Sequence, residues 1–169
     1  MPIKSDTPLS VALQLAGLGW SVLPVCWPKP DGSCDCPRGH DKEDSGKAPL
    51  TPNGVKNATR DRAAIEGWWT EWPSANVGVA LASSGLVAID CDSAEALQEA
   101  SDLGLPLSLC RMSRWPAYVF QATVGTPKTN RTHWGESHKL DILGVGYLVV
   151  HGTHQTGRDI YLEGERLLE

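Results

Sequence analysis

The chain has 169 residues, 41% of them hydrophobic, and a formal net charge of −5 at pH 7. This length fits one domain, and no apolar run reaches about 18 residues, which excludes an ordinary membrane-spanning helix. The acidic balance argues against a general nucleic-acid coat protein, because non-specific affinity for nucleic acid comes from Lys and Arg side chains that neutralise phosphates.

The first 54 residues predict a helix, a strand and a long loop. They lack the basic start and apolar stretch of a signal peptide, so we expect a cytoplasmic protein whose five cysteines form no disulfides. Residues 7–19 predict a helix, because Thr7 can cap it and the apolar residues share one face. Residues 20–25 predict a short strand. Residues 27–54, rich in Pro and Gly, predict an irregular loop, and so long a loop is usually functional or held by a metal.

The rest of the chain predicts further helices and strands. Thr59 caps a predicted helix that Pro73 ends, and Ser93 caps a second one over residues 94–104. The predicted strands cover residues 76–82, 85–92, 107–113, 117–123, 139–144 and 146–152, with a polar stretch at 126–138. This order predicts an α/β or α+β fold with a largely buried sheet, and we interpret residues 1–169 as a single domain.

Two carboxylates stand two residues apart at the end of the apolar run LVAI, at Asp90 and Asp92. Side chains two apart on a strand point to the same face. These carboxylates would therefore repel each other unless one is protonated or a divalent cation lies between them. Asp141, flanked by apolar residues on another predicted strand, would be a third carboxylate for a two-metal site. The alternative is that Asp90 and Asp92 only cap the helix that begins near Ser93.

Seven stretches form an ordered set along the chain: GWSVLPV, GKAPLT, GVKNATRD, IEGWWTEWPSANVGVAL, GLVAIDCD, KLDILGVGYLVV and THQTGRDIY. Together they resemble the bifunctional primase-polymerase (prim-pol) domain of the archaeo-eukaryotic primase superfamily, which is found in phage and plasmid replication proteins. The resemblance implies an α/β core with an RNA-recognition-fold-like mixed sheet flanked by helices. It also implies DNA-templated nucleotidyl transfer, as a DNA polymerase or primase, by a two-metal mechanism with Mg²⁺ or Mn²⁺.

The resemblance also implies partners and site residues. The partners are a DNA template and primer, nucleoside triphosphates, and a helicase domain of a larger replication protein of which this chain would be the N-terminal part. Asp90 and Asp92 match the first metal-binding motif, and Asp141 matches the third. Between them the family has a histidine that contacts the incoming nucleotide, and here that position is Ala117. Alanine cannot hydrogen-bond a phosphate, so either another residue serves, or nucleotide binding is weakened, or the histidine has been replaced in this chain.

Other residues are candidates for nucleotide binding. Ser113, Arg114 and Lys139 belong to a basic stretch, residues 111–139, that could neutralise phosphates, and the alternative for each is a solvated strand end. Asn76 and Gly78 match the family's N-V-G-V element, and Gly78 would allow close approach of the backbone. His151 and His154, after the strand that follows Asp141, are weaker candidates to replace the missing histidine.

The cysteines suggest a second metal site. Cys34, Cys36 and His40 lie in the long loop and Cys26 precedes it, in the pattern C-x7-C-x-C-x3-H. Thiolates and imidazoles are zinc ligands, and a metal can hold a loop that has no core of its own. Some prim-pol relatives carry such a zinc loop, here at about 26–54, which ends in G-K-H-P, but this chain has Ala48 in place of that histidine. The loop therefore either binds zinc or lacks a ligand, and Cys26 is either a ligand or a buried thiol.

Two other functions remain open. Ala117 favours a catalytically impaired module that binds nucleotide or DNA without incorporation. The carboxylates alone would also suit a metal-dependent phosphohydrolase or nuclease.

Overall fold

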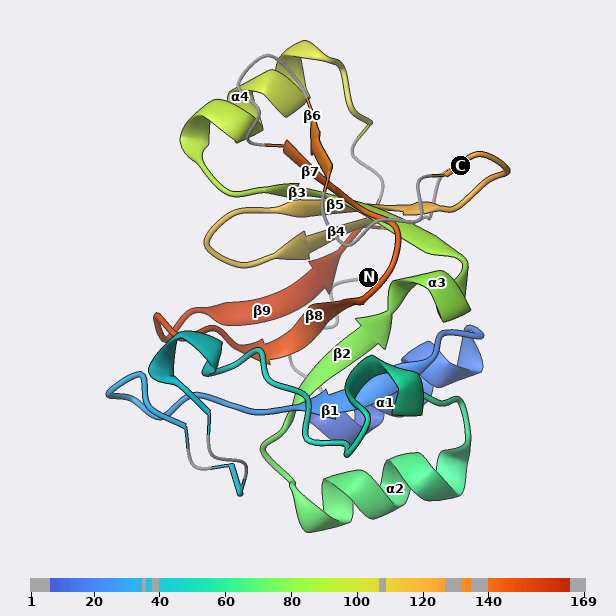
Figure 1. The fold of residues 1–169 in the computed structure, drawn as a ribbon, viewed down its shortest axis with the longest axis vertical. Coiled ribbons are helices and arrows are strands. Elements are labelled where there is room, and N and C mark those ends of the chain that lie inside the picture. Colours follow the sequence, from blue (N-terminus) through green and yellow to red (C-terminus); the bar gives the residue numbers. More distant parts are fainter. Residues whose placement is uncertain are drawn as a thin grey trace.

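The computed structural model describes residues 7–34, 36–37, 40–106, 109–126, 132–134 and 140–164, with only the backbone of 132–134. These residues form a nine-stranded sheet (Figure 1). Its strands are β1 (Val22–Val25), β2 (Asn76–Ala80), β3 (Leu86–Cys91), β4 (Leu109–Met112), β5 (Ala117–Gln121), β6 (Thr132–Trp134), β7 (Leu140–Leu143), β8 (Tyr147–Thr153) and β9 (Asp159–Glu163). Within the described part of the chain, no helix combines the length and hydropathy needed to cross a membrane.

The strands lie side by side in the order β1-β2-β8-β9-β4-β5-β3-β7-β6. Every pairing that the structure describes is antiparallel. The predicted α+β class is confirmed, but these strand directions differ from the mixed sheet that the resemblance implied. Short connections such as the one between β4 and β5 explain the difference, because antiparallel strands can be joined by a tight turn whereas parallel strands need a long crossover.

The helices cover two separate parts of this sheet. They are α1 (Pro8–Gly17), α2 (Arg62–Glu71), the single turn α3 (Leu81–Ser84) and α4 (Ala94–Asp102), with 3-10 turns η1 (Lys42–Asp44) and η2 (Gly54–Asn57). In Figure 1, α1 and α2 lie beside β1 and β2, whereas α4 lies at the other end beside β3 and β7. Ser93 caps α4 as predicted, since its side chain accepts the Ala96 N–H at 3.1 Å.

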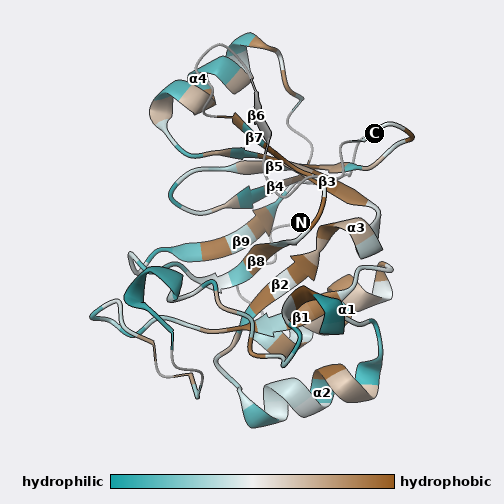
Figure 2. Ribbon diagram, in the orientation of Figure 1, coloured by the Kyte–Doolittle hydropathy of each residue, from teal (hydrophilic) through white to brown (hydrophobic). Residues whose placement is uncertain are grey.

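Strand β3 separates two hydrophobic cores, because its side chains alternate between the two faces. Leu86 and Ala88 pack in the larger core with α1, α2, β1, β2 and β8. Val87, Ile89 and Cys91 point the other way and pack with α4, Tyr118 and Leu140. Figure 2 shows hydrophobic residues concentrated on the strands and hydrophilic residues in the loops. Asp90, next in the Leu86–Ala88 row, therefore points to the side of the larger core.

The structure corrects several predicted elements. Leu81 and Ala82 belong to the single turn α3 instead of extending the strand before them, so Ala80 ends β2. Asp61 caps α2 in place of Thr59, because the Asp61 side chain accepts the Ala64 N–H at 2.7 Å while Thr59 bridges to Val22 on β1. Strands β6 and β9 were not predicted from the sequence, because β6 lies in a polar stretch and β9 has acidic residues at both ends.

Candidate active site

One row of side chains crosses the middle of the sheet. Asp90 on β3 lies directly opposite Asp141 on β7 and directly opposite Ala117 on β5. Ala117 in turn lies opposite Arg111 on β4. Because directly opposed residues of antiparallel strands share a face of the sheet, these four side chains form one row. Two of the three carboxylates predicted from the sequence are thus neighbours by strand register.

Arg111 reaches along this row to Asp90. Its Nη2 donates to Asp90 Oδ1 at 2.6 Å, across the strand that carries Ala117. Ala117 is fully buried and presents only a methyl group, so the guanidinium can pass over it. The other terminal nitrogen, Nη1, donates to Ser113 Oγ and, at 3.3 Å, to the Trp115 carbonyl. A guanidinium therefore lies where the family resemblance led us to expect a histidine.

The carboxylates differ in burial. Asp141 is only 1% exposed, and Asp90 is mostly buried beside Arg111. Asp92 follows β3 and is exposed. Two like charges on adjacent strands repel each other, and in this structure the Arg111 guanidinium offsets the charge of Asp90. The row is therefore a place that attracts a cation.

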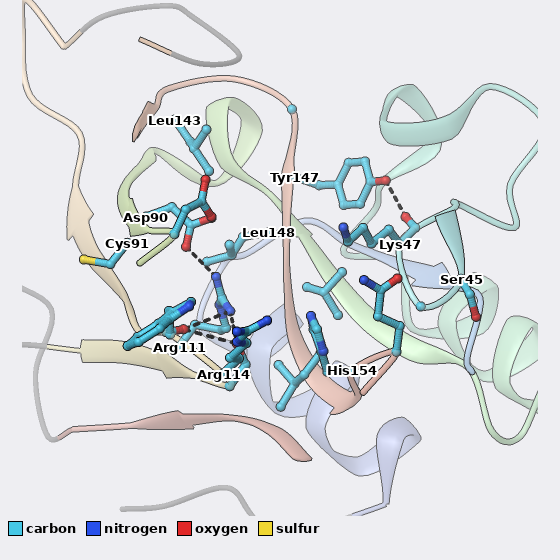
Figure 3. A pocket seen from close by; sticks show the side chains of 18 of the residues that line it. Ser45, Lys47, Asp90, Cys91, Arg111, Arg114, Leu143, Tyr147, Leu148 and His154 are labelled. Carbon is cyan, nitrogen blue, oxygen red and sulfur yellow. Dashed lines mark hydrogen bonds and ion pairs between the residues drawn. The ribbon is translucent and has the colours of Figure 1, made fainter. Parts of the chain in front are cut away.

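A cavity of about 550 Å³ opens beside the row. The residues that line it come from four parts of the chain and include Ser45–Lys47, Asp90–Asp92, Arg111, Ser113–Trp115, Leu143, Val145–Val149, His154, Gln155 and Ile160. Figure 3 shows Asp90 and Arg111 on one side of the cavity and Lys47 with Tyr147 on the other. The volume lies within the range of small-molecule sites.

The cationic groups of the cavity act on His154. Burial, and then the positive charges of Lys47, Arg111, Arg114 and Arg158, lower the pKa of His154 below its ordinary value of 6.5. The ring is therefore neutral at pH 7. Its Nδ1 accepts the Thr156 N–H at 3.2 Å, so the proton resides on Nε2, which can donate. This end of the cavity thus combines positive charge with a neutral donor, which suits a polyanion.

Two residues of the cavity wall were not selected from the sequence. Lys47 belongs to the GKAPLT stretch, which contributed to the family resemblance and to the interpretation of the zinc loop, and Tyr147 looked like an ordinary strand residue. The Tyr147 hydroxyl donates to the Lys47 carbonyl. Burial, with the charges of Cys26 and Asp44, raises the pKa of Tyr147 to about 12, so this hydroxyl keeps its proton. Arg111 was counted among the basic residues but not assigned to the site, because only strand register reveals its neighbour.

The other predicted nucleotide-binding residues lie in different places. Ser113 and Arg114 line the cavity, and the Arg114 guanidinium lies 6.0 Å from the centre of the Trp115 ring. Gly78 lies inside β2, where an added Cβ would come within 2.9 Å of Val25 Cγ2 and 3.0 Å of Leu23 Cδ2, so packing accounts for this glycine. Lys139 is outside the described residues.

Asn76 is a buried clamp away from the carboxylates. Its Nδ2 donates to the carbonyls of Thr153 at 2.9 Å and Gly46 at 3.3 Å, and its Oδ1 accepts the Thr153 N–H at 2.9 Å. Gly152, with φ +126°, makes room for it, because an added Cβ would lie 1.9 Å from Asn76 Oδ1. The amide therefore joins β2 and the end of β8 to the long loop.

The four metal-ligand candidates of the loop converge. One ligand atom from each of Cys26, Cys34, Cys36 and His40 lies within 4.8 Å of all the others, and Cys36 Sγ is 3.1 Å from His40 Nε2. A tetrahedral zinc with bonds of about 2.3 Å to sulfur has ligand atoms about 3.7 Å apart, which these side chains can reach. Cys26 could thus supply a fourth ligand in a chain that has Ala48 where the family resemblance led us to expect a histidine. We call these four residues the Cys/His centre.

The thiols of this centre have unusual pKa values. Burial, and then Cys34, raises the pKa of Cys26 to about 12. Burial also acts to raise the pKa of Cys34, but hydrogen bonds from Cys36, Cys26 and His40 outweigh it and lower that pKa overall. A bound metal would deprotonate both thiols, since thiolates are the ligands.

Comparison with protein families matches residues 12–164 to the family described as bifunctional DNA primase/polymerase, N-terminal. No curated protein and no solved structure matches the chain significantly. The matched range includes the row on the sheet, the cavity and the Cys/His centre. The family resemblance predicted from the sequence is thereby confirmed.

Proposed function

The chain belongs to the Prim-Pol family of bifunctional DNA primases/polymerases, and we propose from this premise that it performs DNA-templated nucleotidyl transfer at the cavity beside Asp90. The observation that carries this proposal is the register of β3 and β7, which sets Asp90 directly opposite Asp141. The DNA template and primer, the nucleoside triphosphate and a helicase domain of the full-length protein are parts of the same proposal.

The donor set fits Mg²⁺ or Mn²⁺. Both ions take carboxylate oxygens, and the place beside Asp90 already attracts a cation, since a guanidinium lies against it. We propose that Asp90, Asp92 and Asp141 hold the ions. What these ions supply when bound is a lower pKa for the primer 3′-hydroxyl and neutralisation of the triphosphate and the leaving pyrophosphate.

Arg111 takes over the phosphate contact of the missing histidine in this proposal. Its guanidinium is already on the same face as the carboxylates, directly across from Ala117. A guanidinium binds phosphate oxygens in bidentate fashion, whereas the alanine methyl group cannot. When a cation takes its place beside Asp90, Arg111 is free to turn to the nucleotide. Arg114 adds a second guanidinium to the same wall of the cavity.

The Cys/His centre binds zinc in the same proposal. Thiolate and imidazole ligands are typical of structural zinc sites, whereas Mg²⁺ and Mn²⁺ prefer oxygen. Its place in a Pro/Gly-rich loop gives it a structural task, because the loop has little core to hold it.

Primer extension tests the reaction. We expect Asp90→Asn and Asp141→Asn to lower extension of a recessed primer by at least about 1,000-fold with Mn²⁺, since each removes a charge that holds the ions. Asp102→Asn, at the exposed end of α4, is the matched control and keeps the wild-type rate. Circular dichroism verifies that each variant is folded. Wild-type extension by a folded Asp141→Asn variant would refute the proposal.

Ala117 supports one rival function, a module that binds nucleotide without incorporating it. The same assay separates the two: binding of dATP by the wild-type chain without any incorporation favours the rival. Ala117→His sharpens the test. A rate gain of at least about 10-fold from this change would indicate an impaired polymerase, because a positioned histidine contributes on that scale or more.

A further inference from the structure

We propose that Lys47 is a triphosphate-binding residue of the cavity and that the Cys/His centre holds it in place. This inference rests on the proposed function and names a residue and a device for the same site. The cavity has one wall formed by Ser45, Gly46 and Lys47, and this wall faces the one formed by Asp90 and Arg111 (Figure 3). Figure 3 shows the Lys47 amine directed from the loop toward the cavity.

Lys47 has a side chain suited to a ligand that comes from outside. It is exposed, lines the cavity, and within the described part of the chain makes no ion pair with a carboxylate. Arg111 and Arg114 line the same cavity, and like charges that share a site repel one another. A polyanion such as a triphosphate relieves this repulsion, because several phosphate oxygens can accept from several cations at once.

The backbone of Lys47 is held much more firmly than its side chain. Its carbonyl accepts from the Tyr147 hydroxyl, and its N–H donates to the Asp44 carbonyl at 2.9 Å. The preceding residue, Gly46, is held from two sides: its N–H donates to Cys26 Sγ at 3.1 Å, and its carbonyl accepts from Asn76 Nδ2 at 3.3 Å. A lysine on a fixed backbone loses less entropy when it binds a phosphate than one on a free loop.

Cys26 connects this backbone to the metal centre. It is one of the four residues of the Cys/His centre and also the acceptor for the Gly46 N–H. A metal would replace the thiol proton that the Asp44 carbonyl accepts at 3.4 Å, and its bond to the sulfur would fix that atom beside the Gly46 N–H. Zinc binding therefore tightens the contact that positions Gly46 and, next to it, Lys47.

Glycine is needed at position 46 for this connection. Its φ is +79°, in the left-handed region that other residues rarely adopt, and an added Cβ would come within 3.3 Å of the Thr153 carbonyl oxygen. The loop is thus pressed against the end of β8, one residue before His154, which also lines the cavity. Short contacts therefore connect the Cys/His centre to Lys47 and to the cavity.

The first test is nucleotide affinity, with dATP and Mn²⁺ as the probe and fluorescence anisotropy or calorimetry as the readout. We expect Lys47→Gln to weaken dATP binding on the order of 10-fold, the scale of one hydrogen bond to a charged group, and Lys47→Arg to restore most of the affinity. Lys42→Gln is the matched control, an exposed lysine of the same loop outside the cavity wall, and it binds dATP as wild type does.

The second test is the coupling to the centre. His40→Ala removes a ligand without altering the Cys26–Gly46 contact, and metal analysis shows whether zinc is lost. We expect the zinc-free variant to bind dATP about as weakly as Lys47→Gln does, and the double variant to be hardly weaker than either, since residues that act through one contact are not additive. Wild-type protein stripped of zinc by a chelator gives the same result without substitution.

The outcomes separate this inference from the proposed function. Unchanged dATP affinity in Lys47→Gln overturns the role of Lys47. Additive losses in the double variant overturn the coupling to the centre, as does a zinc-free protein that retains full affinity. A wild-type chain that binds dATP through Lys47 yet extends no primer contradicts the polymerase proposal and leaves this one standing. A wild-type chain that does not bind dATP at all overturns both.

Discussion

The two sites of this chain are built in different ways. Asp90 and Asp141 lie on paired strands, so the hydrogen-bonded ladder of the sheet sets their separation and direction. The Cys/His centre lies in the loop of residues 26–54, where short 3-10 turns and a few side-chain contacts replace a ladder. The carboxylate row is therefore preformed by the fold, whereas we expect the Cys/His centre to need a bound metal to become equally rigid.

Removing zinc tests that difference with the largest expected effect. We expect a chelator to raise the rate of tryptic cleavage in the loop, at Lys42 or Lys47, by roughly 100-fold, because metal binding supplies much of the free energy that orders such a segment. Arg111, on β4, stays protected. Equal cleavage rates with and without zinc, after metal analysis proves that zinc has left, would show that the loop is rigid by itself.

Asn76→Ala tests the clamp between the sheet and the loop. The change leaves a buried backbone carbonyl of Gly46 and half-buried backbone groups of Thr153 without their partner, so we expect a loss of about 2 kcal/mol in the free energy of unfolding, measured in urea. Asn57→Ala, which removes one exposed hydrogen bond to Asn53, is the control and costs less. If the two variants are equally stable and only dATP binding falls in Asn76→Ala, then Asn76 is a nucleotide ligand and not a clamp.

Arg111→Gln tests whether the guanidinium competes with a metal ion for Asp90 in the carboxylate row. Removing the guanidinium frees Asp90, so we expect Mn²⁺ to bind about 10-fold more tightly when no nucleotide is present. The same variant should bind dATP about 10-fold more weakly, because a phosphate contact is lost. Tighter binding of Mn²⁺ together with weaker binding of dATP would distinguish this role of Arg111 from structural damage, which would weaken both. Arg62→Gln, which breaks the exposed pair with Glu66, should change neither affinity.

His154 gives the smallest expected effect, a shift in the pH dependence of stability. Its pKa in the folded chain is below the ordinary 6.5, so the unfolded chain takes up the proton first as pH falls. The folded state therefore loses stability below about pH 6.5, and above that pH the histidine contributes no such dependence. His154→Gln should lose less stability than wild type between about pH 7.5 and about pH 5.5 in urea unfolding. Equal losses would mean that the folded and unfolded chains bind this proton alike.

How much of the molecule could be predicted from the sequence depends on the same difference between positions within strands and contacts made by loops. Asp90 and Asp141 were predicted as neighbours because each follows or lies within an apolar strand, and strands bring such positions together. Cys26, Cys34, Cys36 and His40 were also grouped from their spacing, with Cys26 left open as either a ligand or a buried thiol, and the structure brings all four together. Arg111 beside Asp90 was not predicted, because a contact between β4 and β3 across β5 depends on a register that no local pattern encodes.

Lys47 could not be predicted for a related reason. Its position depends on Cys26, Asn76 and Tyr147, which are distant in the chain and meet only in the folded loop. Leu81 and Ala82 were wrongly predicted as the end of a strand because they continue an apolar run, whereas in the structure they begin the turn α3, which is followed by Gly85 with φ +65°. Local patterns thus predicted apolar strands and the spacing of the cysteines, but not the contacts between residues that are distant in the chain.

The most direct test of the claim that the carboxylate row holds the catalytic ions is a measurement of Mn²⁺ binding there. Electron paramagnetic resonance would monitor the binding on zinc-loaded protein with dATP present. Zinc in the Cys/His centre keeps that site occupied, and Mn²⁺ prefers oxygen ligands. We expect wild type and Asp102→Asn to bind Mn²⁺ alike, and Asp90→Asn and Asp141→Asn to bind it at least about 10-fold more weakly. Wild-type Mn²⁺ affinity in both folded variants would contradict the account.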